Sequence, residues 1–226
     1  MSHRHQVLII ARVGDRYRLL AGLSHIWLYG QYALNSCLRC CKIFQADVNR
    51  EALQTEISLA QRADAGVWDR KAAHRGEDDH IESPPFPFIM SCLFVGAFSL
   101  SSQHDNDISA LDIRRSCWEF ENNDGLTIID VSILDHVRYC FLEGNETRNR
   151  DDDNPSEKNT PLSAQQYLRK YYDNSEVQAH GMQALIDELF AWSLLSIAAL
   201  KSTWPAEAWP EDGYSSSITI CIHRIL

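Results

Sequence analysis

The chain has 226 residues, of which 45% are hydrophobic, 10% aromatic and 23% charged, and its formal net charge is −10. This composition is ordinary for a globular protein that buries its own core, and it excludes general disorder. The net negative charge repels a phosphate backbone, so we expect no nucleic acid among the partners.

The N-terminal segment lacks the pattern of an export signal. Its apolar run from Val7 to Ala11 is shorter than the core of a signal peptide, and Arg12 follows it directly. No segment of the sequence reaches the roughly 18 uninterrupted apolar residues that span a bilayer. The seven cysteines leave at least one unpaired and show no disulfide framework. We therefore expect an intracellular, cytoplasmic protein with no membrane partner.

The first elements are two β-rich runs, HQVLIIARV and RYRLLAGLS, with Gly14 and Asp15 between them. Glycine and aspartate between such runs indicate a tight antiparallel hairpin. Apolar residues then recur with the i, i+3, i+4, i+7 spacing of a helix that buries one face. This spacing predicts one helix over residues 31–44 and a second from about residue 49 to residue 68.

The middle of the chain predicts a loop and then several strands. The charged, proline-rich segment near 69–87 is typical of a flexible surface loop. The apolar run FIMSCLFVGAFSL predicts a fully buried strand with a bulge at Gly96, and a buried helix is the alternative. Three further strands are expected in ALDIRRSCWEFE, LTIIDVS and HVRYCFLE, so that a meander of about four strands results.

Asp124 and Gly125 lie between SCWEFE and LTIIDVS and indicate a tight hairpin between those two strands. The same stretch resembles an EF-hand loop. With Gly125 at position 6, however, Phe120 falls at position 1 and Val131 at position 12. Neither side chain can bind calcium, so an EF-hand is excluded.

The last third of the chain predicts helices. The segment near 143–159 has the charged, amide-rich composition of a flexible loop. Beyond it, Ser163 and Gln166 have the spacing of a capping box, which marks the start of a helix. Ser175 and Gln178 repeat that spacing and predict a further helix, or a broken one, that runs toward residue 200.

Together these elements predict an α+β fold, with a largely antiparallel sheet (the N-terminal hairpin plus the later meander) packed with helices. We expect residues 1–210 to form a single globular domain with flexible loops near 69–87 and 143–159. Residues 211–226 form a tail whose packing the sequence leaves open. Its run SSSITICIHRIL is β-like and could add a strand to a sheet edge.

Cysteine, histidine and acidic residues gather in three places, but their spacing does not provide a complete set of metal ligands. Cys37, Cys40 and Cys41 form a C-x-x-C-C pattern, but a structural zinc site needs four ligands and no second C-x-x-C supplies them. We expect these cysteines to pack in the core. The loops at 74–82 and 104–107 are rich in histidine and acid, a composition that is usually just solvated. We therefore expect no metal and no cofactor.

The candidate ligand pocket lies at the junction of the second strand and the first helix. His25, Trp27 and Tyr29 stand there, and aromatic side chains with polar tips can line a pocket, although they pack as core or cap a helix more often. An acidic residue from a loop, such as Asp130, would complete the candidate set. The sequence assigns no catalytic residue.

Several stretches are similar to a group of uncharacterised proteins of filamentous fungi. They are MSHRHQ, HIWLYG, PFPFIMSCL, NNDGLTIID, VRYCF and TPLSAQQYL. The resemblance covers residue 1 to about residue 210, whereas ITICIHRIL departs from the acidic, low-complexity end expected in that group. Because the group has no assigned activity, the resemblance implies no catalytic residue.

The sequence contains no complete catalytic or phosphate-binding motif. It therefore favours an intracellular binding or interaction protein without catalytic chemistry, which has a protein partner or associates with itself. The alternative is a small-molecule enzyme, for example a hydrolase, with a pocket near His25, Trp27 and Tyr29.

Overall fold

A single sheet positions the other elements of the molecule. The computed structural model describes residues 4–26, 28–68, 84–98, 108–114, 123–144, 159–179 and 181–205. Within these ranges six strands form one sheet in the order β3-β2-β1-β4-β5-β6. The strands are β1 (Arg4–Val13), β2 (Arg16–Ile26), β3 (Ile108–Ala110), β4 (Leu126–Asp130), β5 (Arg138–Leu142) and β6 (Ser193–Leu194).

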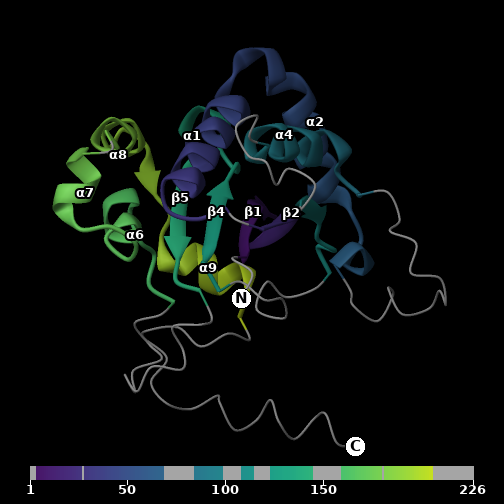
Figure 1. The fold of residues 1–226 in the computed structure, drawn as a ribbon. Helices are drawn as coiled ribbons and strands as arrows, with labels where there is room; N and C mark the ends of the chain where they lie inside the picture. The colour runs from purple at the N-terminus through teal and green to yellow at the C-terminus, as the bar shows by residue number, and fades with distance from the viewer. Residues whose placement is uncertain are drawn as a thin grey trace, which may run out of the picture.

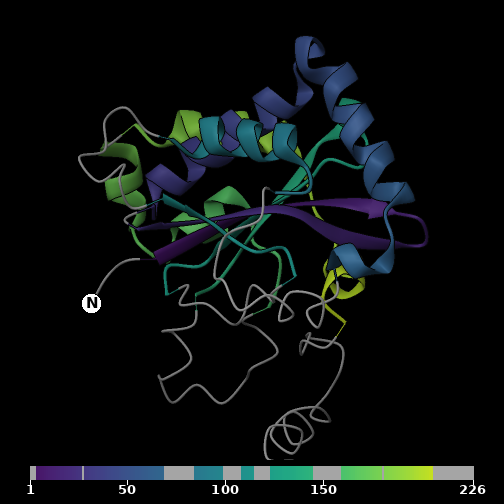
Figure 2. The same cartoon turned by 90° about the vertical axis from the view of Figure 1, so that its right-hand side faces the viewer.

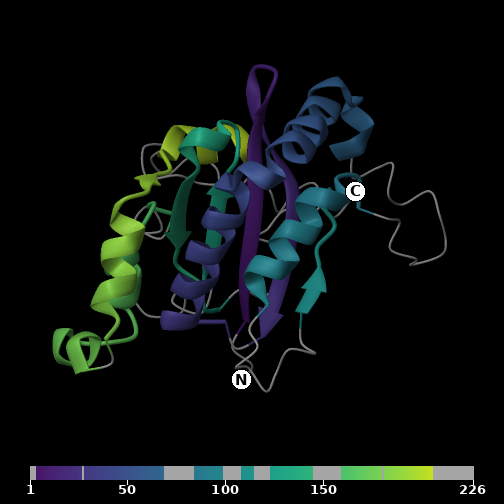
Figure 3. The same ribbon diagram turned by 90° about the horizontal axis from the view of Figure 1, so that it is seen from above.

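The N-terminal hairpin is confirmed. β1 and β2 pair in antiparallel register from Arg4 opposite Ile26 to Val13 opposite Arg16. Gly14 adopts a φ of 64°, which a side chain would disfavour, so the glycine predicted in the turn is required there. The turn projects beyond the neighbouring strands, as Figure 3 shows.

The prediction of a largely antiparallel sheet is wrong, because the sheet is mixed. Of the predicted meander, only the antiparallel pair of β4 and β5 is confirmed. β4 lies parallel to β1 and antiparallel to β5, and β6 is parallel to β5. Gly125 does adopt a positive φ of 97°, but both edges of β4 are occupied by β1 and β5, so no hairpin partner can precede it. Of the predicted strand before the turn, residues 115–122 lie outside the described residues. The Asp-Gly dipeptide indicates only the turn, so it could not predict that β4 pairs in parallel with β1.

A layer of helices covers one face of the sheet (Figures 1 and 2). α1 (Gln31–Gln45) and α2 (Asp47–Arg62) confirm the two helices predicted after the hairpin. α2 ends before residue 68, and a short 3-10 helix, η1 (Ala65–Trp68), follows. The indole of Trp68 donates a hydrogen bond to the Leu19 carbonyl over 2.9 Å and so covers part of the outer edge of β2.

The strand predicted at FIMSCLFVGAFSL is wrong, because the segment forms helix α4 (Pro87–Ala97). Its apolar residues occur on every side of the helix, so periodicity alone could not separate strand from helix. The start of α4 is set by proline at its first position and by the Glu56 carboxylate of α2. This carboxylate accepts hydrogen bonds from the amides of Phe88 (2.8 Å) and Ile89 (2.7 Å). Gly96 is not a bulge; it allows α4 to approach Cys40 of α1 where a Cβ would collide.

The remaining helices lie at the β6 side and on the second face of the sheet. They are η4 (Leu134–His136), α6 (Ala164–Leu168), α7 (Asn174–Ala179), α8 (Gln183–Phe190) and α9 (Ile197–Thr203). In Figure 1 the helices α6, α7 and α8 form a group beside β5, and Figure 2 shows α9 on the face opposite α1 and α4. The helix predicted toward residue 200 is therefore broken, with β6 between α8 and α9.

The caps of these helices test two predictions. The capping box at the start of α6 is confirmed, since the Ser163 amide donates to the Gln166 side chain (2.8 Å) and the Gln166 amide to Ser163 Oγ (3.3 Å). The box predicted from Ser175 is wrong by two residues. Asp173 receives the Glu176 amide on its carboxylate (2.9 Å), and its own amide donates to the Glu176 side chain (2.8 Å).

The predicted core cysteines are confirmed. Cys37, Cys40 and Cys41 are fully buried in α1 and have free thiols. Burial raises the pKa of the Cys37 and Cys40 thiols, so neither forms the reactive thiolate near neutral pH. These thiols act as small apolar side chains between α1 and its neighbours.

Two further expectations concern the whole chain. Across the ranges given above, none of the helices has both the length and the apolar character needed to cross a membrane. The loops predicted near 69–87 and 143–159 fall mostly outside the described residues, although α4 already begins at Pro87. The tail at 211–226 lies outside them entirely.

Candidate functional site

The predicted pocket residues lie in different environments. His25 is 1% exposed and stands opposite His5 in the β1–β2 ladder, with its Nδ1 2.5 Å from the Ile26 carbonyl oxygen. Trp27 lies outside the described residues. Tyr29 is half-buried, and its ring lies 6.0 Å from the ring of Tyr171. The junction therefore packs against the segment after α6.

His5, which is not among the predicted pocket residues, is the centre of a buried polar network. Its Nδ1 lies 3.1 Å from the Asp124 carbonyl oxygen and its Nε2 lies 2.8 Å from Thr127 Oγ1. Because a carbonyl only accepts hydrogen bonds, the proton of the neutral ring belongs on Nδ1, and the threonine hydroxyl donates to Nε2. Both ring nitrogens are thus satisfied when His5 is neutral.

The Asp124 carbonyl connects His5 to α6. It also accepts hydrogen bonds from the hydroxyls of Tyr167 (3.0 Å) and Tyr171 (2.7 Å). The Tyr167 ring stacks on Phe141 of β5 at a centroid distance of 4.5 Å. We call His5, Thr127, Tyr167, Tyr171 and the Asp124 carbonyl the His5 network.

Burial controls ionisation in the His5 network. It lowers the pKa of His5 to about 3; the hydrogen bond to Asp124 opposes this shift, and nearby His25 adds to it. Burial also raises the pKa of the Tyr167 and Tyr171 hydroxyls. At neutral pH the network is uncharged, and a histidine with this pKa is a poor general base there.

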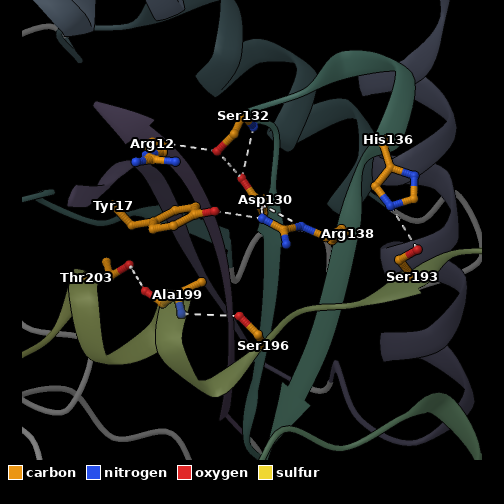
Figure 4. Close-up of polar contacts among 10 residues, drawn as sticks. All are labelled: Arg12, Tyr17, Asp130, Ser132, His136, Arg138, Ser193, Ser196, Ala199 and Thr203. Atoms are coloured by element: carbon orange, nitrogen blue, oxygen red, sulfur yellow. Dashed lines mark hydrogen bonds and ion pairs between the residues drawn. The ribbon is translucent and has the colours of Figure 1, made fainter. Parts of the chain in front are cut away.

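Asp130 belongs to a second polar cluster, shown in Figure 4. Its carboxylate, 1% exposed, accepts a hydrogen bond from Arg138 Nε over 2.9 Å and another from the Ser132 amide over 2.9 Å. Arg138 also donates to the Tyr17 hydroxyl over 2.7 Å. Burial alone would lower the pKa of Arg138, but the hydrogen bonds to Asp130 and Tyr17 raise it. We call Asp130, Ser132, Arg138 and Tyr17 the Asp130 cluster.

The Asp130 cluster holds the β1–β2 hairpin near its turn. Ser132 Oγ accepts a hydrogen bond from the Arg12 amide over 2.7 Å, and Ser202 of α9 accepts one from the Tyr17 amide over 2.9 Å. Figure 4 shows α9 alongside the cluster, so the hairpin, β4, β5 and α9 meet at this point. Each polar group of the cluster is engaged by another, which is typical of a structural anchor.

The structure does not bring His25 and Asp130 together. His25 is opposite His5 on β1, whereas Asp130 is opposite Ile10. Five residues of strand separate these positions, which is roughly 16 Å along the sheet. A hydrolase pocket that uses both residues therefore has no support in the strand register.

A surface serine and histidine pair is the other arrangement with catalytic residue types. Ser193 Oγ lies 3.0 Å from His136 Nε2, and Figure 4 shows the pair apart from the Asp130 cluster. The adjacent acid, Asp135, is bound by Arg50 over 2.6 Å. Nucleophilic catalysis needs a base that a third group orients, and here the neighbouring carboxylate serves a different ion pair.

Metal binding also lacks a built site among the residues whose positions are described. In that part of the chain no three histidine, cysteine or acidic side chains lie where they could hold an ion. The histidine-rich and acidic loops at 74–82 and 104–107 lie outside it.

Comparisons of the chain with protein-family models, with curated proteins and with solved structures found no match.

Proposed function

We propose that the protein is a binding protein without catalytic chemistry, which recognises an apolar helix of a partner protein through the outward face of α4. The carrying observation is the exposure of Phe94 and Val95, whose side chains are 43% and 63% accessible. These two neighbours lie on a helix whose segment Pro87–Ala97 contains no charged residue. Adjacent exposed apolar side chains of this kind are typical of interaction surfaces.

The outward face of α4 is continuous along the helix. Ser91 and Phe98 lie one turn to either side of the two exposed residues, and the rings of Phe94 and Phe98 stack with centroids 6.4 Å apart. Ser91, the polar member, satisfies its hydroxyl within the helix by donating to the Pro87 carbonyl over 2.7 Å. A partner covering this face would leave no charge and no free hydroxyl buried.

The helix is also held rigidly, which favours binding. The Glu56 carboxylate fixes its first turn, and the close approach at Gly96 fixes its last turn against α1. A preorganised surface loses little conformational freedom when a partner docks. The apolar face of an amphipathic helix is the matching ligand, because its row of i, i+3 and i+4 side chains packs against such a surface.

Site-specific photo-crosslinking tests the proposal. A benzoylphenylalanine residue at position 95 should form one discrete crosslinked product in cells, and Phe94→Glu should abolish it. The matched control is position 48, because Val48 is an apolar residue of another helix, α2, and is 90% exposed. A product of twice the 25.8 kDa chain mass would identify a second copy as the partner. No product at position 95, or equal products at both positions, would reject the proposal.

A further inference from the structure

The α6 segment (residues 162–172) is attached to the sheet by backbone pairing, by ring contacts and by the buried side chains of Leu162, Ala164, Tyr167 and Leu168. Leu162 and Phe141 exchange two backbone hydrogen bonds, of 3.0 and 2.8 Å. Tyr167 stacks on Phe141, and the ring of Tyr172 lies against Gly30, where a Cβ would come within 2.8 Å of it. α6 itself has five residues, so its own backbone hydrogen bonds contribute little stability.

The polar part of this attachment converges on His5. Tyr167 is tied to the same carbonyl oxygen as His5, its hydroxyl lies 3.4 Å from His5 Nδ1, and the two rings meet edge to face at 6.0 Å. Because His5 is fully buried beneath this segment, detachment of Tyr167 and Tyr171 would open the ring to water. Detachment of the α6 segment and exposure of His5 to water are thus coupled.

We infer that His5 is a pH sensor: acidification below about pH 6.5 shifts the α6 segment toward an opened state, because the closed state buries the neutral imidazole whereas the opened state exposes the ring to water, where it is protonated. The sensor is independent of the α4 face and of what binds there.

The groups that face His5 explain why the closed state excludes the charge. Across the β1–β2 ladder stands His25, which adds repulsion when it is protonated. The turn before β4 supplies the Asp124 carbonyl, which is shared with two tyrosine hydroxyls, and β4 supplies the uncharged Thr127. The Asp124 side chain, 7% exposed, lies in the same turn, and its negative charge contributes to the raised pKa of Tyr167 and Tyr171. The nearest ion pair of the segment joins Lys170 to Glu143 over 2.5 Å, so that carboxylate is already matched by a cation.

The sign and size of the effect follow from proton linkage. His5 has an ordinary pKa of 6.5 when open and a pKa of about 3 when closed. Between these values the open state binds one more proton, so opening becomes about tenfold more favourable for each pH unit lost below about 6. Between pH 7 and pH 5 the opening equilibrium rises about 25-fold.

Hydrogen–deuterium exchange at the two pH values, corrected for intrinsic exchange rates, measures this opening directly. Peptides from residues 162–172 should lose about 25-fold protection at pH 5 and should exchange faster than peptides from β1, β2 and α1, whose protection falls only with the global stability. His5→Gln should remove most of the pH dependence, and His136→Gln, which changes an exposed histidine outside the network, should leave it intact.

Three outcomes would overturn the inference: unchanged protection of residues 162–172 in the wild-type protein, exchange of that segment at pH 5 no faster than that of β1, β2 and α1, or full pH dependence in His5→Gln. The first two are measured on the unaltered chain, so the test stands even if the variant does not fold. His25→Gln completes the set, because a flat response in that variant and a full one in His5→Gln would move the sensor to His25.

Discussion

The His5 network and the Asp130 cluster bury polar groups at two ends of the same strands by opposite means. The His5 network consists of neutral groups that share the Asp124 carbonyl, whereas the Asp130 cluster encloses an ion pair between Asp130 and Arg138. The neutral network stabilises the uncharged imidazole of His5, so protonation of that ring destabilises it. The ion pair of Asp130 and Arg138 is destabilised when either charge is removed, because the other charge is then buried without a partner. The two ends should therefore fail under different perturbations.

The largest expected effect is at the charged end. Arg138→Met leaves the Asp130 carboxylate buried without its cation, which should lower the free energy of unfolding by about 4 kcal/mol. Urea denaturation at pH 7 measures the loss. Arg50→Met is the matched control, because it removes a surface ion pair with Asp135 and should change stability little. Equal losses in the two variants would contradict the role given to the Asp130 cluster.

The second effect is at the neutral end. Thr127→Val keeps the shape of the side chain but removes the hydroxyl that donates to His5 Nε2, which leaves a buried acceptor unsatisfied. We expect a loss of about 2 kcal/mol in the same urea assay. Thr55→Val serves as the control, since its hydroxyl bonds only to its own helix on an exposed face. A loss no larger than that of the control would show that Nε2 is satisfied in another way.

The third effect separates the two ends by pH. The unfolded chain protonates His5 below about pH 6.5, whereas the folded chain keeps it neutral to about pH 3. Stability from this group is complete above pH 6.5 and should fall by about 1.5 kcal/mol between pH 6.5 and pH 5. Urea titrations across that range should show the slope in wild type and in Arg138→Met, but a much smaller slope in His5→Gln. If Arg138→Met removed the pH dependence of stability, the titrating group would lie in the Asp130 cluster and not in the His5 network.

The smallest effect concerns one of several shared hydrogen bonds. Tyr171→Phe removes one donor from the Asp124 carbonyl, which still accepts from His5 and Tyr167. The expected loss is about 1 kcal/mol by urea denaturation. Tyr32→Phe, an exposed position on α1, should have no measurable effect. If Tyr171→Phe costs as much as Thr127→Val, the carbonyl depends on that donor more than the geometry indicates.

Local signals in the sequence were sufficient for the elements that form locally. The Gly-Asp turn of β1 and β2, the apolar stripe of α1 and the capping box of α6 each involve residues close together in the chain, and each was predicted. The sequence of α4 predicts a strand wrongly, because an apolar run without a clear period fits either element. What decides its structure is the Glu56 cap, which comes from another helix.

The candidate site was harder to predict than the fold, because its contacts are long-range. His25 and Asp130 were placed in one pocket for their chemical types, but the register of β1 against β2 and β4 separates them. His5 meets the Asp124 carbonyl from 119 positions away, and Tyr167 reaches His5 from 162 positions away. No spacing rule connects residues so far apart, so the two networks become visible only in the folded chain.

The central place of β1 has a consequence for how the protein is made. One edge of β1 pairs with β2 as soon as the hairpin is complete, but the other edge must wait for β4, more than half of the chain later. During synthesis the growing chain therefore carries an open, apolar strand edge of the kind that pairs with other chains. We expect the nascent protein to need chaperones until residue 130 has left the ribosome, and to fold slowly afterwards because β1 and β4 pair from distant parts of the chain.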